Sequence, residues 1–143
     1  NLALTRIRRR LQRGRSHAAP WYSGLQEDER EHLRPLGRRL VALVSDYLTK
    51  GARRGPLMEE ARGIAREYGS LVSRDGLSLR DTLEAFMFFR KTLDETAMEE
   101  AQKSDMTVEK ALELWELLSN LEEQMLLSIA ESYEKTESVA ARR

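Results

Sequence analysis

Histidine is the side chain that most often carries acid–base chemistry or binds a metal near neutral pH, and this chain of 143 residues contains two, His17 and His32. Glu29 and His32 form a Glu-x-x-His pair, and helical di-iron sites use two such pairs. The second pair is missing, because a glycine, Gly14, stands three residues before His17. The charged neighbours of His32 are typical of a solvated helix start. We therefore predict no metal site.

Other catalytic or cofactor chemistry finds no better support in the sequence. Haem needs an axial histidine, methionine, cysteine or tyrosine, but neither histidine falls on a helix expected to line the core, and the five methionines are typical of residues that fill gaps in a core. Cysteine is absent, which excludes disulfides, thiolate nucleophiles and zinc–thiolate sites. No Gly-x-Ser-x-Gly motif and no glycine-rich phosphate loop occurs. The chain is predicted to be no enzyme and to hold no cofactor.

Four aromatic residues are candidates for the lining of a small-molecule pocket, because such pockets are lined mainly by apolar and aromatic side chains. They are Tyr68, Phe86, Phe89 and Trp115. Ordinary core packing explains the same four side chains and is the favoured interpretation.

Charge is distributed unevenly along a chain whose net charge is zero. Residues 1–15 hold six arginines and no acid, whereas residues 94–123 hold ten acids against two lysines. The arginines, with Arg8, Arg9 and Arg10 as the contacts, could bind nucleic-acid phosphates, although no aromatic interleaving or helix-turn-helix pattern accompanies them. The other interpretation is an electrostatic contact between the two ends of the chain or with a partner.

The elements that position these residues are predicted to be helices, since no segment shows the strict alternation of a strand. Caps, glycines and apolar spacing give a basic helix over 2–13, a linker to Pro20, and helices over 23–50, 57–73, 79–103 and 108–136. We expect a basic segment and linker at 1–20 and one helical domain at 21–143. No apolar stretch approaches the ~20 residues that cross a bilayer, so no membrane span is expected. Because the first residue is Asn, we expect a part of a longer protein.

The helix predicted over 79–103 has the most informative sequence. Gly76 ends the preceding helix, and Ser78 with Asp81 caps the start of this one. Four apolar residues, Phe86 to Phe89, then follow consecutively and point about 100° apart around the axis. This pattern predicts a helix at the centre of the fold, wrapped by others.

The last predicted helix, capped by Thr107, carries more leucines than one core-facing stripe needs. We therefore expect one face to pack in the domain and another to pack against a second copy of the chain. The predicted dimer interface consists of Leu114, Leu117, Leu121 and Met125.

Two segments resemble a known family. Residues 21–30, Trp-Tyr-Ser-Gly-Leu-Gln-Glu-Asp-Glu-Arg, look like the entry to helical regulatory domains. Residues 59–95 resemble the N-terminal domain of RsbR-type stressosome co-antagonists and are similar to the sensory N-terminal region of some PucR-type transcription regulators. The motifs that carry the resemblance are Glu60-Ala61-Arg62, Gly76-Leu77-Ser78-Leu79, Ala85-Phe86 and Phe89-Arg90.

The resemblance implies a non-haem, globin-like helical domain of about five or six helices with a long C-terminal helix. It further implies a cytoplasmic homodimer that passes a signal to an attached output domain of a transcriptional or stress-response regulator. The arginine-rich residues 1–15 depart from the family pattern. The alternative function is therefore DNA binding through that segment.

Overall fold

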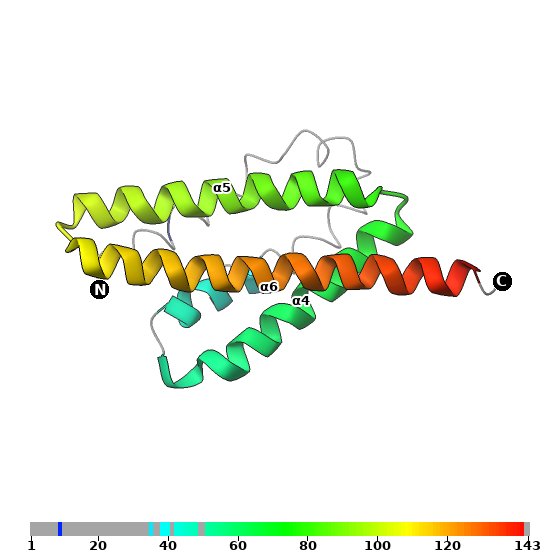
Figure 1. Ribbon diagram of the computed structural model, residues 1–143, viewed down its shortest axis with the longest axis horizontal. Coiled ribbons are helices and arrows are strands. Elements are labelled where there is room, and N and C mark those ends of the chain that lie inside the picture. The colour runs from blue at the N-terminus through cyan, green and yellow to red at the C-terminus, as the bar shows by residue number, and fades with distance from the viewer. Residues whose placement is uncertain (1–8, 10–34, 36–37, 41, 49–50, 142–143) are drawn as a thin grey trace.

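The structure, a computed structural model, describes residues 9, 35, 38–40, 42–48 and 51–141, with side chains as far as residue 135. All regular elements in these residues are helices (Figure 1). They are the 3-10 helix η1 (Gly51–Arg53), α4 (Arg54–Arg74), α5 (Leu79–Lys103) and α6 (Val108–Ala141), and residues 38–40 and 42–48 are also helical. The predicted all-α class with a long C-terminal helix is thus confirmed. No helix of the described part is long and apolar enough to span a membrane.

Helix α6 is the element around which the described part is built. It has 34 residues, which makes it about 51 Å long. It lies antiparallel beside α5, and α4 crosses it obliquely (Figure 1). α6 contacts both α4 and α5, whereas α4 and α5 hardly touch each other. Residues from the helical stretch 42–48 complete the core, namely Leu43, Val44, Tyr47 and Leu48.

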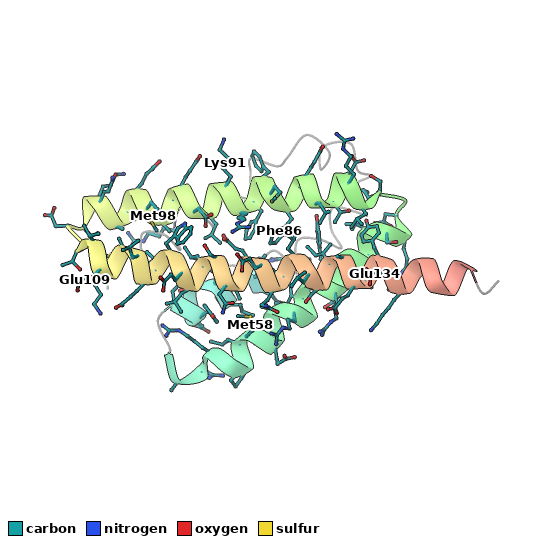
Figure 2. The ribbon with its side chains drawn as sticks, in the orientation of Figure 1. Met58, Phe86, Lys91, Met98, Glu109 and Glu134 are labelled. Carbon is teal, nitrogen blue, oxygen red and sulfur yellow. The ribbon has the colours of Figure 1, made fainter. Side chains whose placement is uncertain are left out.

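The position of α5 differs from the prediction. Phe86 is buried and points toward α6, while Lys91 lies on the opposite side of the helix (Figure 2). Met87 and Phe88 are 51% and 46% exposed. The prediction that other helices wrap this one on every side is therefore wrong for the part of the chain that the structure describes. α6 occupies the central place instead.

The connection from α4 to α5 forms as predicted. Gly76 has φ +87°, and the Leu77 N–H donates to the Val72 carbonyl at 3.0 Å, the long hydrogen bond of a Schellman motif. The Ser78 hydroxyl then accepts from the Asp81 N–H at 3.1 Å and caps α5. Because these signals act within a few residues, the sequence alone was enough to locate this turn.

The connection from α5 to α6 uses the same motif without glycine. Asp105 has φ 52°, and the Met106 N–H donates to the Ala101 carbonyl at 3.1 Å. The Thr107 hydroxyl accepts from the Lys110 N–H at 3.2 Å, which confirms the predicted cap of α6.

The predicted break before α4 is shorter in the structure. η1 runs directly into α4, which begins three residues earlier than expected. Pro56 lies in the first turn of α4, where a helix has no internal acceptor for a backbone N–H. Proline there does not interrupt the helix.

Helices α4 and α6 pack closely together at Gly69. A Cβ at this position would stand 2.0 Å from the Ser132 hydroxyl and 3.3 Å from the Ile129 carbonyl oxygen. Only a glycine allows the two backbones to pack at this distance. This contact fixes the second half of α6 on α4.

Candidate functional site

The residues that could do acid–base or metal chemistry do not form a site in the described structure. His17 and His32 lie outside the described residues. Within those residues, no three side chains of histidine, cysteine, aspartate or glutamate are grouped so that they could hold a metal.

The four aromatic residues proposed for a pocket are only partly together. Phe86 and Phe89 form a tilted pair on α5, with ring centroids 6.1 Å apart. Tyr68 on α4 is half-buried, and burial, followed by the nearby Tyr133, raises the pKa of its phenol well above its usual range. Trp115 is 48% exposed. Core packing explains the burial of Phe86, and a pocket lined by all four aromatic residues stays a prediction.

The residues predicted for the dimer interface pack mostly in the chain's own core. Leu114, Leu121 and Met125 are 6%, 0% and 3% exposed, and Leu117 is half-buried against the same core. Side chains so deeply buried offer no surface to a second copy in this conformation. The exposed apolar residues of α6 lie on a different face.

Of the arginines proposed to contact nucleic acid, Arg9 is helical and exposed, and Arg8 and Arg10 lie outside the described residues. Nucleic-acid contact through these arginines stays a prediction.

The structure brings together a different group of charged side chains, between α5 and α6. Glu122 on α6 is 1% exposed, and its Oε1 lies 3.1 Å from Nε of Arg90 on α5. Arg90 Nε is also 3.9 Å from Oδ2 of Asp94, one turn further along α5. We refer to Arg90, Asp94 and Glu122 as the seam cluster.

Burial controls the protonation of the seam cluster. Burial, then a hydrogen bond with Asp94 and its negative charge, raises the pKa of Glu122 to about 9, and Arg90 opposes this change. At neutral pH Glu122 therefore carries a proton that it can donate to the Asp94 carboxylate. Arg90 then balances the charge of Asp94, and the cluster holds one positive and one negative group.

The hydrogen bonding of the seam cluster is incomplete when both acids are ionised. Oδ1 of Asp94 and both oxygens of Glu122 then accept no hydrogen bond from the described residues, and the same holds for the buried hydroxyl of Ser119, one turn earlier on α6. Buried polar atoms without partners are costly. The contact between α5 and α6 is therefore less favourable here than an apolar contact of the same area, and it is sensitive to a single proton.

A second polar contact joins α6 to the turn between α4 and α5. The Tyr133 hydroxyl donates to the Leu77 carbonyl at 2.9 Å and lies 2.6 Å from the buried Thr82 hydroxyl. Since Tyr133 has one proton, Thr82 is the donor of the shorter bond. Burial raises the pKa of Tyr133, so this contact stays protonated at neutral pH.

Sequence reasoning missed the seam cluster because acids on helices usually face solvent. One signal was available. Glu122 lies four residues after Leu118, three before Met125 and seven before Ile129, so it shares the buried stripe of α6 with three apolar residues. A lone acid on such a stripe indicates a buried carboxyl group.

Comparison with known families settles the kind of domain. Residues 3–143 match the family model described as the RsbT co-antagonist protein rsbRD N-terminal domain. The chain belongs to this family. No curated protein and no solved structure matches it.

Membership confirms the RsbR-type resemblance that residues 21–30 and 59–95 indicated. The match covers nearly all of the chain, including most of the arginine-rich residues 1–15. Co-antagonist N-terminal domains are regulatory, so the chain is a regulatory domain. The similarity to PucR-type regulators and the division at residue 20 stay predictions.

Proposed function

We propose that this co-antagonist N-terminal domain senses or relays a signal as a homodimer and takes no part in catalysis. The observation that carries the proposal is the family match over residues 3–143. Its setting would be a cytoplasmic regulator of transcription or of the stress response, with an output domain or regulatory protein as the partner.

Helix α6 is the element through which we expect the signal to pass. It contacts both α4 and α5, so a displacement of α4 or α5 is transmitted through α6 to the other helix. The seam cluster lies on the α5–α6 contact and gives this contact two protonation states, of which the protonated one is favoured at neutral pH. A ligand or partner that prefers one packing of α5 on α6 would shift the population toward it.

The contact with a second copy is proposed to lie on the first half of α5, because the interface predicted on α6 is used by the core. Leu79, Leu83 and Met87 line a shallow hollow there. Phe88 is 46% exposed beside Met87. Leu79, Leu83 and Met87 form an apolar strip along one face of α5, and Phe88 lies about 100° further around the helix axis.

Opposite charges accompany this surface. Arg80 Nε lies 3.4 Å from Glu84 Oε1, and the two side chains are 87% and 66% exposed. In a two-fold symmetric dimer Arg80 of one copy can pair with Glu84 of the other copy, and the reverse. Arg80 and Glu84 line the hollow together with the apolar side chains, and a surface that carries both signs suits self-association.

Light scattering on the purified chain tests this surface. We expect a dimer that becomes a monomer when Met87 and Phe88 are both replaced by Glu, because two charges would be buried in the contact. Trp115→Glu, an equally exposed apolar residue on α6, should remain dimeric. A wild-type monomer, or a dimer that survives the double substitution, would remove the α5 interface.

Leu121→Glu separates the two interface hypotheses. Because Leu121 is fully buried within the chain, the substitution should unfold the domain, which circular dichroism would show. A folded monomer would instead restore the interface first predicted on α6.

The alternative function, DNA binding through residues 6–15, rests on the arginines and on the exposure of Arg9. It predicts duplex binding that weakens steeply with salt and is lost when Arg8, Arg9 and Arg10 become Ala. Binding that is absent or independent of salt would exclude it.

A further inference from the structure

The first half of α6 presents an apolar stripe that no described residue covers. Val108, Leu112 and Trp115 are 76%, 55% and 48% exposed. Their spacing of four and three residues places them on one face of the helix. We refer to these three residues as the α6 stripe. Isolated exposed apolar residues are common, but three in a row along one helix face mark a contact surface.

Acidic side chains run beside the α6 stripe. Glu109, Glu116 and Glu123 are all exposed and recur every seven residues, so they form a row next to the stripe. An apolar stripe with a negative margin calls for an occupant that is both apolar and positively charged. A second α6 stripe does not meet this requirement, because it would bring two acidic rows together.

The N-terminal segment of the chain has the required pattern. Leu4, Ile7 and Leu11 are spaced as one stripe of a helix, and Arg8 and Arg10 fall on its two margins. The segment 1–15 contains no acid. Arg9, its one described residue, is helical and exposed, as expected for a residue on the outer face of a docked helix.

We propose that residues 2–13 dock on the α6 stripe of the same chain, with Leu4, Ile7 and Leu11 against Val108, Leu112 and Trp115. The arginines at the margins then lie near the acidic row. This gives the arginine-rich segment an intramolecular role that depends neither on DNA nor on the proposed dimer. It also covers the α6 stripe with the chain's own residues.

Disulfide trapping tests the docking directly, because the chain contains no cysteine. Two variants are made in the full chain, Ile7→Cys with Leu112→Cys, and Leu11→Cys with Leu112→Cys. The matched control is Ile7→Cys with Leu127→Cys, since Leu127 is as exposed as Leu112 but lies about 22 Å further along α6. Mild oxidation is followed by non-reducing electrophoresis and intact mass.

We expect a monomeric disulfide in at least one of the two pairs, formed at least about ten-fold faster than in the control, since docking raises the local concentration of the thiols. Equal rates in all three variants would overturn the proposal. Covalent dimers in place of monomeric disulfides would also overturn it, because they would place the segment on a second copy.

Fluorescence of Trp115 gives a second readout that needs no cross-link. In a Trp21→Phe background Trp115 is the only tryptophan. Replacement of Ile7 and Leu11 by Asp should expose it, with a red-shifted emission and greater quenching by acrylamide, whereas Leu25→Asp should leave its emission unchanged. Emission that is the same in all three proteins would contradict docking.

Discussion

At the scale of single residues, the buried carboxyl group of Glu122 has the largest consequence for the behaviour of the domain. Its pKa is raised from 4.5 to about 9, so between these values the folded chain holds a proton that the unfolded chain has released. The folded state therefore binds more protons, and the free energy of unfolding falls as the pH rises. The stabilisation is complete below the unfolded pKa and is lost through the folded one.

Glu122→Gln should remove most of this pH dependence, because glutamine resembles the protonated acid and cannot ionise. Between about pH 5 and pH 9 the wild type should lose at least about 1.4 kcal/mol more stability than the variant, the equivalent of one pKa unit. Urea unfolding at a series of pH values measures the difference. Glu123, the exposed neighbour of Glu122, supplies the control, because the stability of Glu123→Gln should depend on pH in the same way as that of the wild type. Parallel curves for wild type and Glu122→Gln would contradict a buried, protonated acid.

The turn at Asp105 offers a second test at this scale. Its positive φ of 52° is a conformation that glycine adopts without strain. Asp105→Gly should therefore stabilise the domain by about 0.5 kcal/mol, whereas Gly76→Ala, at φ +87°, should destabilise it by about 1 kcal/mol. Thermal unfolding compares the two variants, and a destabilised Asp105→Gly together with a stabilised Gly76→Ala would show that neither turn is governed by its backbone conformation.

Sequence reasoning was strongest for such local features. Gly76, Ser78 and Thr107 were assigned correctly because caps and turns depend on residues a few positions away. Burial of Glu122 was missed because it depends on which face α6 turns toward α5, and that is a tertiary property.

At the scale of helices, the packing of α4 on α6 depends on the absence of a side chain at Gly69. Gly69→Ala should destabilise the domain by about 1–3 kcal/mol, since the new methyl group would overlap the Ser132 hydroxyl and press on the Ile129 carbonyl. Ser132→Ala in the same chain should restore part of the loss. Denaturant unfolding of the single and double variants measures both.

Gly63 is the matched control on the same helix. It is exposed within α4, and a Cβ there would meet nothing within 4 Å. Gly63→Ala should stabilise the domain by about 0.5–1 kcal/mol through helix propensity. If Gly69→Ala is equally stabilising, the close approach of α4 and α6 is wrong.

Which helix lies at the centre was not predictable from composition. Four consecutive apolar residues made α5 look fully surrounded, yet Met87 and Phe88 are about half exposed. Apolar residues on several faces are compatible with burial and with an unoccupied contact surface, and the sequence pattern does not distinguish the two. α6 showed the same ambiguity, because its apolar residues pack in the core on one face and form the α6 stripe on another.

At the scale of the whole molecule, polar contacts at two points along α6, the longest helix of the described residues, hold this helix in position. The seam cluster lies near the middle of α6, and the contact of Tyr133 with the α4–α5 turn lies nearer its C-terminal end. Beyond this turn α6 continues past the N-terminal end of α5 (Figure 1). A shift of α5 against α6 at the seam cluster would therefore move this projecting part of α6.

The central claim, that two copies associate and that α6 moves with the seam cluster, is tested most directly by spin-label distances. Glu134 is exposed on α6 beyond Tyr133 (Figure 2), and Glu134→Cys gives one label per chain because the chain has no other cysteine. Double electron–electron resonance near pH 7 should show one defined distance between the two labels of a dimer. At about pH 9.5, above the pKa of Glu122, that distance should change in the wild type and not in Glu122→Gln. Absence of any dipolar coupling would contradict the dimer, and identical distances at both pH values would contradict movement of α6 with the seam cluster.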